Sequence, residues 1–423
     1  MKSDIKERIE KLNRGQVPEG YKKIQGQIMP DSWNIYKLEE VIASSDYGTS
    51  EQTNDTKGYP VLRMGNLVDG KISSENLVYV DLDRESFNNL KLEKGDLLFN
   101  RTNSYDLVGK VSLFDLDGDY TFASYLIRLK VINSKVLPKY LNYYMNLNSS
   151  QKLIKAFSTK GVQQVNVNIN TLKKFFKVKL PSNIFEQQKI VDILSIWDKA
   201  IELKEKLIEQ KKEQKKGLMQ RLLTGKVRLP GFKGEWKEVR LGEVLKERKE
   251  TGHVHLELLA ITAQRGIVRR DEVDIKDNSS EDKSKYKRIM PLDIGYNTMR
   301  MWQGVSGVSK YEGIVSPAYT VLKPTDKVDS YFMGYLFKLP KVIDKFRRYS
   351  QGLVDDTLNL KYENFKVIKV RIPQDVNEQK AIAQILICVD KEIEFLEKEL
   401  EALKQQKKGL MQLLLTGKIR VKC

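Results

Sequence analysis

The sequence predicts an α+β protein in which two related globular domains are each followed by a long helix, the helices pairing as an antiparallel coiled coil. Three observations support this fold class: a repeat with an offset of 192 residues, a heptad stripe in each repeated helix, and strand-like alternation before each helix. We place the globular domains at residues 1–183 and 227–375, with an N-terminal lead at 1–29. The helices with their tails occupy residues 184–226 and 376–423.

The repeat is strongest around the end of each helix. Residues 214–228 match residues 406–420 at 13 of 15 positions, and the same offset aligns the run Val-Lys-Leu-Pro at 178–181 with Val-Arg-Ile-Pro at 370–373. A match of this length indicates two copies of one unit. Because two copies are too few for a solenoid, we expect a pseudo-twofold pair of domains.

Each copy contains a helix whose stripe residues are spaced four and three apart, the heptad pattern of a coiled coil. The first stripe is Ile190, Leu194, Trp197, Ile201, Lys204, Ile208, Lys211, Lys215, Leu218 and Leu222. The second is Ile382, Leu386, Val389, Ile393, Leu396, Leu400, Leu403, Lys407, Leu410 and Leu414. A charged helix packed on its own domain is the alternative, but the period of 3.5 favours a seam with the other copy. Antiparallel packing suits a twofold arrangement.

Punctuation residues mark where these helices begin and end. Pro181 and Pro373 precede them, and Gly225 and Gly417 follow them within Thr-Gly-Lys runs that suit a helix C-terminus. Before each helix, alternating apolar residues and turn signals predict strands, for example at 95–100 and 292–297. Each domain then has a helical stretch, Tyr140 to Phe157 in the first copy and Tyr331 to Tyr349 in the second.

Composition indicates which partners the chain could bind. Lys and Arg number 74 against 56 Asp and Glu, giving a net charge of +18. That excess favours a polyanion, because phosphates attract dispersed cations and binding releases counterions; a basic protein without such a partner is the alternative. The two cysteines form no metal or disulfide framework, which fits a reducing cytoplasm. With neither a run of about 18 apolar residues nor a signal-peptide core, we expect a cytoplasmic protein without a membrane span.

The sequence carries no convincing catalytic signature. The Gly-Lys of Thr224-Gly225-Lys226 lacks the supporting glycine and the Ser or Thr of a phosphate-binding loop. His253 and His255 are the only histidines and have no nearby cysteine, so we expect no metal site. No two prolines are adjacent, which removes the Asn/Asp-Pro-Pro-aromatic loop of an adenine methyltransferase. We therefore assign no catalytic residue.

Two polar loops at equivalent places in the copies are candidates for reading DNA bases. Arginine grips guanine, and Asn or Gln grips adenine, although the same residues are common in ordinary polar turns. The candidates in the first loop are Asn100, Arg101, Thr102, Asn103 and Ser104, and those in the second are Thr298, Arg300, Trp302 and Gln303. Lys160, Gln163 and Gln164 are weaker candidates, either as phosphate contacts or as a solvated loop.

These motifs resemble one known family, the specificity subunits of type I restriction-modification systems. The runs Asp96–Ser104 and Leu107–Lys110 resemble the family's first-domain motif, and Glu186–Ile190 through Gly217–Lys226 resembles its helix. The resemblance covers essentially the whole chain. The second domain departs from the first, with Asn-Thr-Met-Arg-Met-Trp-Gln-Gly at 297–304, so no base assignment transfers between the domains.

The resemblance implies two target-recognition domains that each read one half of a split, asymmetric double-stranded DNA site. It implies an antiparallel coiled coil that spaces the half-sites and docks two modification subunits, with Leu218, Leu222, Leu410 and Leu414 in or near the docking surfaces. It places S-adenosylmethionine, ATP and Mg²⁺ in the adenine-N6 modification and restriction/translocase subunits, with no cofactor in this chain. The alternatives are a coiled-coil scaffold that does not read DNA and a nuclease with its own active site.

Overall fold

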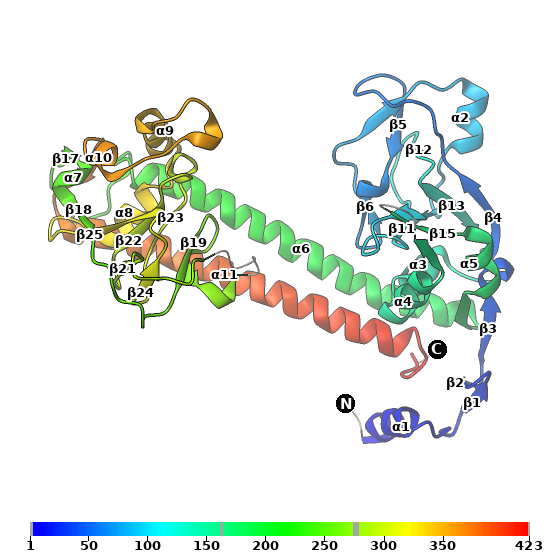
Figure 1. Ribbon diagram of the computed structural model, residues 1–423. Coiled ribbons are helices and arrows are strands. Elements are labelled where there is room, and N and C mark those ends of the chain that lie inside the picture. The colour runs from blue at the N-terminus through cyan, green and yellow to red at the C-terminus, as the bar shows by residue number, and fades with distance from the viewer. Residues whose placement is uncertain (1–2, 161–163, 274–278, 422–423) are drawn as a thin grey trace. The chain divides into compact units, whose positions relative to one another are not determined.

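Two helices of 39 residues each, α6 (Ile184–Leu222) and α11 (Val376–Leu414), follow the two globular parts of the chain in the computed structural model (Figure 1). The structure describes residues 3–160, 164–273 and 279–421. It divides into unit 1, residues 1–203 with 399–423, and unit 2, residues 204–398. Each unit combines one globular part with a piece of both long helices.

Unit 1 is built on a six-stranded sheet in the order β4-β13-β9-β11-β7-β6. Its strands are β4 (Ile42–Tyr47), β13 (Leu126–Val131), β9 (Leu97–Asn100), β11 (Val111–Leu113), β7 (Lys71–Ile72) and β6 (Leu67–Val68). A three-stranded sheet, β12-β5-β8, contains β12 (Thr121–Phe122), β5 (Tyr59–Leu62) and β8 (Val78–Val80). Another, β10-β15-β14, contains β10 (Thr102–Asn103), β15 (Val165–Val167) and β14 (Ser158–Lys160).

Two further strand pairs and five shorter helices complete the described part of unit 1. The pairs are β1 (Tyr21–Ile24) with β2 (Gln27–Pro30), and β3 (Trp33–Lys37) with β16 (Lys177–Pro181). The helices are α1 (Ser3–Asn13), α2 (Arg84–Leu90), α3 (Pro138–Met145), α4 (Asn148–Ala156) and α5 (Ile169–Phe175).

Unit 2 repeats the central sheet of unit 1 in a smaller form. Its four strands are ordered β18-β25-β22-β23, where β18 is Leu245–Arg248, β25 is Tyr319–Pro324, β22 is Ile294–Asn297 and β23 is Ser306–Val308. This order matches β4-β13-β9-β11 strand for strand, and every neighbouring pair is antiparallel in both units. The two copies therefore keep one core topology although their sequences have diverged.

The remaining elements of unit 2 surround that sheet. The strand pairs are β17 (Trp236–Arg240) with β26 (Lys369–Pro373), β19 (Leu259–Thr262) with β20 (Gly266–Arg269), and β21 (Lys287–Ile289) with β24 (Gly313–Val315). The helices are α7 (Leu241–Val244), α8 (Ser330–Leu336), α9 (Pro340–Tyr349) and α10 (Tyr362–Phe365), with 3₁₀ turns η4 (Met301–Gln303) and η5 (Asp355–Thr357).

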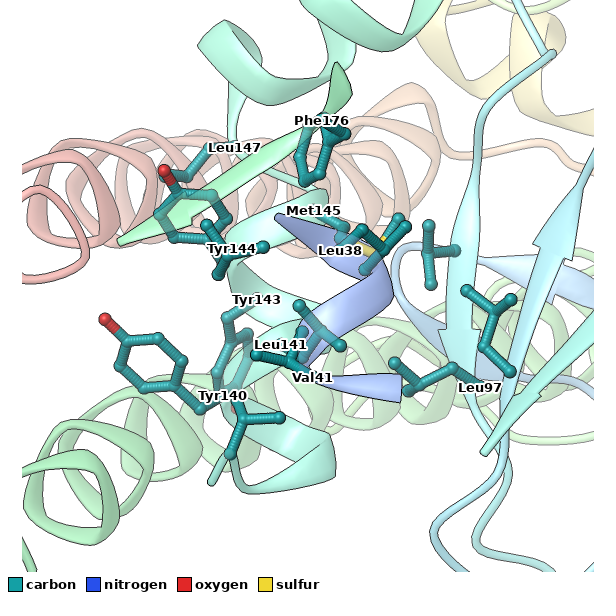
Figure 2. Close-up of a cluster of buried hydrophobic side chains, with 14 of the residues drawn as sticks. Leu38, Val41, Leu97, Tyr140, Leu141, Tyr143, Tyr144, Met145, Leu147 and Phe176 are labelled. Carbon is teal, nitrogen blue, oxygen red and sulfur yellow. The ribbon is translucent and has the colours of Figure 1, made fainter. Parts of the chain in front are cut away.

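The largest apolar core of each unit joins its globular part to the long helices. In unit 1 it includes Ile190 and Leu194 of α6 with Leu414 of α11, packed with residues of the sheet and of α3. Figure 2 shows part of this core, where Leu38 and Val41 gather with side chains of α3. Removing this apolar surface from water supplies the main stabilisation of the junction between domain and helix.

The heptad stripes lie where the sequence predicted. Every stripe residue of both helices is buried or half-buried, whereas Glu205 and Glu394, which lie between stripe positions, are exposed. In unit 2, Lys211 pairs with Glu392 at 2.6 Å and Lys215 with Asp390 at 2.5 Å. From the first pair to the second, the residue number rises along α6 and falls along α11, so the two helices run antiparallel. The predicted fold class is confirmed.

Each long helix ends three residues before the glycine predicted to terminate it, at Leu222 and Leu414. Gly225 and Gly417 have φ values of +69° and +73°, the left-handed region that glycine adopts without strain. A Cβ at Gly225 would lie 3.2 Å from the Trp236 ring, and one at Gly417 would lie 2.5 Å from Pro30 Cδ. The Thr-Gly-Lys runs are therefore helix ends held tightly against the start of a domain.

The helical stretches predicted at 140–157 and 331–349 are helical in the structure, and each is divided into two helices. The first region forms α3 and α4 with a break at Asn146, whose side-chain amide donates to Val111 O at 2.8 Å. The second forms α8 and α9, and Pro340 begins α9. Proline lacks an N–H donor and disfavours helical geometry in the residue before it, so it ends one helix and starts the next.

Candidate nucleic-acid interface

The first polar loop follows β9 and immediately pairs with another strand. β10 runs antiparallel to β15, with Thr102 opposite Asn166 and Asn103 opposite Val165. Arg101 stands between β9 and β10, and its N–H donates to Tyr125 O at 3.2 Å. The loop is therefore a short, backbone-bonded strand, which fixes the direction of each side chain.

Arg101 is the best-placed candidate of this loop. Its guanidinium lies 4.9 Å from the centre of the Tyr47 ring, a cation–π arrangement, and Nε donates to Thr102 Oγ1 at 3.3 Å. Tyr47 is 47% exposed, so the stacked pair lies at the surface. A guanidinium held over a ring and hydrogen-bonded to a neighbouring hydroxyl has restricted freedom, which suits it to bind a base edge or a phosphate.

Two of the five candidates in this loop are buried in the structure. Asn100 is fully buried, and its Nδ2 donates to Leu107 O at 3.4 Å. Thr102 is also buried and donates its hydroxyl to Asn166 Oδ1 at 2.7 Å. Neighbouring residues of an extended chain point to opposite sides, so Asn100 and Thr102 face inward on either side of Arg101.

Asn103 and Ser104 lie at the outer end of the loop. Asn103 is half-buried and its Oδ1 accepts from the Ser104 N–H at 2.8 Å, while Ser104 is exposed. Next to them Tyr105 is 56% exposed, and Lys155 Nζ lies 5.4 Å from the centre of its ring. The sequence pattern pointed to the arginine and asparagines of this loop. The structure adds the exposed Tyr105 and, beside it, Lys155 of α4.

The weaker candidates lie at the β14–β15 hairpin. Lys160 is the last residue of β14, and Gln164 is exposed just before β15. Gln163 lies outside the described residues. Because β15 pairs with both β14 and β10, the hairpin belongs to the same sheet as the first polar loop.

The second polar loop has a different construction. Thr298 donates its hydroxyl to Ala318 O at 2.7 Å, and the Trp302 indole N–H donates to Met299 O at 3.1 Å. These bonds hold the loop, whereas Arg300 and Gln303 are exposed. Arg300 Nη1 lies 3.7 Å from Asp356 Oδ1.

The structure adds one segment to this face that the sequence reasoning did not select. The end of α9 and the loop at 351–359 lie beside the second polar loop, because Leu360 N donates to Thr298 O at 2.9 Å. Arg347 stacks over the Trp302 ring at 5.6 Å and donates Nη2 to Asp355 Oδ1 at 2.9 Å. Leu353 at the tip of the loop is fully exposed. In the sequence, Gln351–Asp355 occupies the position that Lys160–Gln164 occupies in the other copy, and this correspondence could have identified the segment.

Both units fasten their globular part to the two long helices with the same polar residues. In unit 1 the Tyr143 hydroxyl donates to Asp198 Oδ2, and Lys407 Nζ donates to Asp198 Oδ1 at 2.5 Å. In unit 2 Tyr335 donates to Asp390 at 2.6 Å and Lys215 pairs with Asp390 at 2.5 Å. These Tyr-Asp-Lys anchors obey the offset of 192 at every position.

Burial, reinforced by the bonded carboxylate, raises the pKa of Tyr143 and of Tyr335. Both phenols therefore stay protonated at neutral pH and keep donating to the aspartates.

A second repeated contact lies at the helix starts. Glu186 accepts from the Trp33 indole and from Arg420 in unit 1, and Glu378 accepts from Trp236 and Arg228 in unit 2.

The structure assigns most of the helix candidates to packing within the chain. Leu222 and Leu414 are 2% and 3% exposed in the cores of their units, and Leu218 and Leu410 pack half-buried against those cores. The expectation that these four leucines lie in or near a docking surface stays a prediction; within the chain, Leu222 and Leu414 are already covered and Leu218 and Leu410 are partly covered. Among the other stripe candidates, Ile190 and Leu194 belong to the core of unit 1, and Ile382 and Leu386 to the core of unit 2. The rest are buried or half-buried along the helices: Trp197, Ile201, Val389, Ile393 and Leu396.

The described residues were also searched for metal-binding clusters and for helices that could span a membrane. Residues 3–160, 164–273 and 279–421 hold no group of three or more His, Cys, Asp or Glu side chains arranged to bind a metal ion. His253 and His255 lie with ring centres 6.1 Å apart. Every helix in the described ranges is too short or too polar to cross a lipid bilayer.

The fold and its surfaces define a class of protein: two globular domains with one core topology and different polar faces, each followed by a long helix. A family model described as "Type I restriction modification DNA specificity domain" matches residues 30–212 and 275–405. The match spans more than half of the chain, so the chain belongs to this family, whose role is DNA-sequence specificity in type I restriction-modification systems.

Individual relatives agree with this assignment. A Methanocaldococcus jannaschii protein named as the specificity subunit of the type I restriction enzyme MjaX is 29% identical in an alignment that covers 96% of this chain and 97% of that protein. The solved S subunit of a type I restriction-modification system from M. genitalium has a TM-score of 0.53 and 17% identity, covering 90% of this chain and 96% of that one.

A second solved chain comes from a structure titled for complex assembly and conformational transition of the type I restriction-modification system. Its TM-score is 0.56 at 16% identity, and the match covers 92% of this chain and 99% of that one. At these identities the two structures show the shared fold.

Proposed function

We propose that this chain reads a bipartite, asymmetric double-stranded DNA site, one half with each domain, and directs the other subunits of a type I complex to it. One observation carries the proposal: the anchors between domain and helix are the same in both units, whereas the exposed faces differ. Asp198 and Asp390 occupy equivalent positions with equivalent partners. Arg101 and Arg300, by contrast, stand in unlike surroundings.

The difference between the faces supports two unlike half-sites. Arg101 stacks on Tyr47 beside a three-stranded sheet, while Arg300 projects from a loop closed by a 3₁₀ turn and faces Asp356. Side chains that differ in position and in partner present different donor patterns to a base edge. A duplicated fold with two such faces fits an asymmetric target better than a palindrome.

We infer that catalysis belongs to other subunits of the complex. In this proposal the modification subunits bring S-adenosylmethionine and methylate adenine N6, and the restriction subunits bring ATP and Mg²⁺ for translocation and cleavage. The chain itself contributes the choice of sequence. Its net charge of +18 supports contact with the phosphate backbone of the DNA while the sequence is selected.

Two modification subunits would dock on the long helices. Since Leu222 and Leu414 are buried and Leu218 and Leu410 are half-buried, the better candidates are apolar side chains that remain at the surface. Leu203 and Phe395 occupy equivalent positions of α6 and α11 and are 54% and 61% exposed. Exposed apolar side chains at matched places on the two helices support two equivalent contacts for one kind of partner.

The experiment is selection of duplexes from a randomised pool by the full chain assembled with its modification subunits. Binding of the selected and the random duplexes is then compared across salt concentrations. The proposal predicts a split consensus, a large affinity ratio between selected and random DNA, and a steep fall with salt. A scaffold that does not read DNA would give no consensus and no such slope. Mg²⁺-dependent cleavage by the isolated chain would instead indicate a nuclease.

A further inference from the structure

Arg347, near the end of α9 in unit 2, is held from two sides. Its guanidinium lies 5.6 Å from the centre of the Trp302 ring, and its Nη2 donates to Asp355 Oδ1 at 2.9 Å. The ring is itself fixed by the bond from the Trp302 indole to Met299 O. The arginine therefore has a stacking surface on one face and a carboxylate at one edge.

The loop that carries Asp355 is closed at its base. Gln351 and Asn359 exchange backbone bonds at 2.9 and 2.8 Å, and the Thr357 hydroxyl donates to Val354 O at 2.9 Å. Gly352 has a φ of +150°, and a Cβ there would meet Thr357 O at 2.6 Å. A loop pinned in this way presents its carboxylate in one place, so it can hold the arginine in one orientation.

The pairing decides what Arg347 is suited to bind. Guanidinium has five N–H donors in a plane, and within the described part of the chain Arg347 uses only Nη2, which leaves four donors unused. The neighbouring carboxylate offsets its charge, which weakens attraction to a phosphate. Hydrogen bonds to a neutral base edge need no net charge. A planar fork with its charge offset therefore favours a base over the backbone.

Among bases, guanine fits the unused donors. Guanine presents two acceptors, N7 and O6, side by side in the major groove, and arginine binds them bidentately. The side chain of Arg347 is 56% exposed, so the fork is open to a duplex. Its orientation is set before binding, which reduces the freedom lost on contact.

We propose that Arg347, positioned by Asp355 and Trp302, reads a guanine in the half-site of the second domain. This inference rests on the proposed function and makes it specific: one half-site contains a guanine whose recognition depends on Arg347. Asp355 is a positioning residue that touches no DNA. Arg300, whose Nη1 lies 3.7 Å from the Asp356 carboxylate on the same loop, is held more loosely and is the secondary candidate.

The test uses the full chain assembled with its modification subunits, with duplexes selected from a randomised pool. Arg347→Ala is expected to lose the preference at one guanine position of one half-site and to weaken cognate binding by about 10- to 100-fold. Binding to random duplex should change by less than about threefold. Uniform weakening on all sequences, with the salt slope reduced by about 1, would make Arg347 a phosphate contact and overturn the proposal.

Two conservative variants separate the fork from its charge. Arg347→Lys keeps the charge and loses the planar fork, so it should lose the guanine preference while keeping the salt slope. Asp355→Asn keeps the fork and removes the positioning carboxylate. It should weaken cognate binding and strengthen random binding, each by about three- to tenfold, because the freed charge now attracts phosphates. Unchanged guanine preference in both variants would contradict the proposal.

Matched controls lie on the same helix. Arg348 is 72% exposed and pairs with Asp344 one turn earlier. Arg348→Ala and Asp344→Asn make the same charge changes away from Trp302 and should leave the guanine preference intact. Thermal unfolding confirms that each variant folds. If the unaltered complex selects no consensus at all, the proposed function fails as well, whereas a consensus insensitive to Arg347 rejects this inference alone.

Discussion

Asn100 and Arg101 are adjacent in the chain and have opposite roles. Asn100 ends β9 with its side chain fully buried, while Arg101 emerges and stacks on Tyr47. The alternation of an extended chain separates them, and the short pairing of β10 with β15 repeats it at Thr102. At the scale of single residues, the strand register therefore decides which members of a polar motif can reach DNA.

The Arg101→Ala and Arg300→Ala variants test whether each face reads one half-site. Each should cost about 1–3 kcal/mol of binding free energy when its own half-site is cognate. The loss should disappear when that half-site is scrambled, because a base contact is then already absent. Competition binding with duplexes scrambled in one half measures both effects, and each variant serves as the other's control. Equal losses on every duplex would reassign the arginine to the backbone.

Lys338 gives unit 2 a pH dependence. Burial, with a smaller contribution from Lys215, lowers its pKa to about 8, and its Nζ donates to Gly304 O at 2.7 Å and to Ser306 O at 2.9 Å. Because the folded pKa lies below the unfolded value, the unfolded chain binds more protons between them. The free energy of unfolding should therefore rise with pH from about 8 toward 10, by about 1–2 kcal/mol for this half-buried group.

The measurement is chemical unfolding of the wild type and of Lys338→Met across that pH range. The difference between the two proteins isolates Lys338 from the tyrosines, whose raised pKa values act at higher pH. A difference that grows with pH in favour of the wild type is expected. Parallel pH profiles would show that Lys338 does not titrate in this window.

Some candidate site residues could be selected from the sequence, and others could not. Arg101 and Arg300 could be selected because they lie in polar loops at equivalent places. Arg347 could not, because its partner Trp302 is 45 positions away and lies on another element. Asn100 was selected although its side chain is buried, because composition does not reveal on which side of a strand a residue points. Contacts between distant segments and the direction of side chains both come from the tertiary fold.

At the scale of elements, the Tyr-Asp-Lys anchors link one helix of the domain to both long helices. Asp198 lies on α6, Lys407 on α11 and Tyr143 on α3. Three charged or polar groups that satisfy one another also fix an angle, since moving any one element leaves a partner unpaired. Because unit 2 repeats the arrangement with Tyr335, Asp390 and Lys215, we regard it as part of the shared frame.

The two anchors differ in burial, which predicts different energies. The side chains of Asp198 and Lys407 are each 16% exposed, whereas those of Asp390 and Lys215 are 40% and 24% exposed. Asp198→Ala leaves a buried ammonium unpaired and should cost about 3 kcal/mol of stability in unit 1. Asp390→Ala should cost about 1 kcal/mol in unit 2, because solvent compensates the partner.

Native-state hydrogen exchange resolves the two units within the full chain and measures both losses. Tyr143→Phe is the matched control, since it removes one hydrogen bond and leaves the ion pair. It should cost less than Asp198→Ala. If Asp390→Ala proved as damaging as Asp198→Ala, burial would not be what sets the strength of these anchors.

Elements with a strong periodic pattern were predictable from the sequence, and interrupted ones were not. Heptads located α6 and α11, and Gly225 and Gly417 located their ends, because spacing and backbone preference are local properties. The break between α3 and α4 was missed because Asn146 leaves the helix to bond Val111 O, a residue of a strand. A local sequence pattern does not reveal a hydrogen bond to a distant strand that competes with the helix.

At the scale of the whole molecule, one frame carries two different surfaces. The frame is the shared sheet order, the Tyr-Asp-Lys anchors and the two long helices with their terminal glycines; each occurs twice, and the anchors and glycines do so with matching residues. The surfaces are the faces around Arg101 and Arg300. Separating the two allows the faces to diverge without disturbing the core, which explains why the helix tails match so closely while the domains do not.

The long helices are expected to set the distance between half-sites. Seven residues inserted after Lys204 in α6, matched by seven after Leu396 in α11, preserve the heptad and lengthen each helix by about 10 Å. That length equals about three base pairs of duplex, so the gap of the selected consensus should grow by about three base pairs. An unchanged gap with binding intact would show that the helices are not a ruler. An insertion of four residues in α6 alone breaks the register and serves as the disruptive control.

The central claim is that this chain chooses a split DNA sequence for a modification complex. The most direct measurement is methylome sequencing of a methylation-free host that expresses the chain with its modification subunits. We predict methylation of adenine N6 at a single motif made of two unlike half-sites with a fixed gap, and loss of the motif when the chain is omitted. Methylation at a continuous motif, or the same motif without the chain, would contradict the claim.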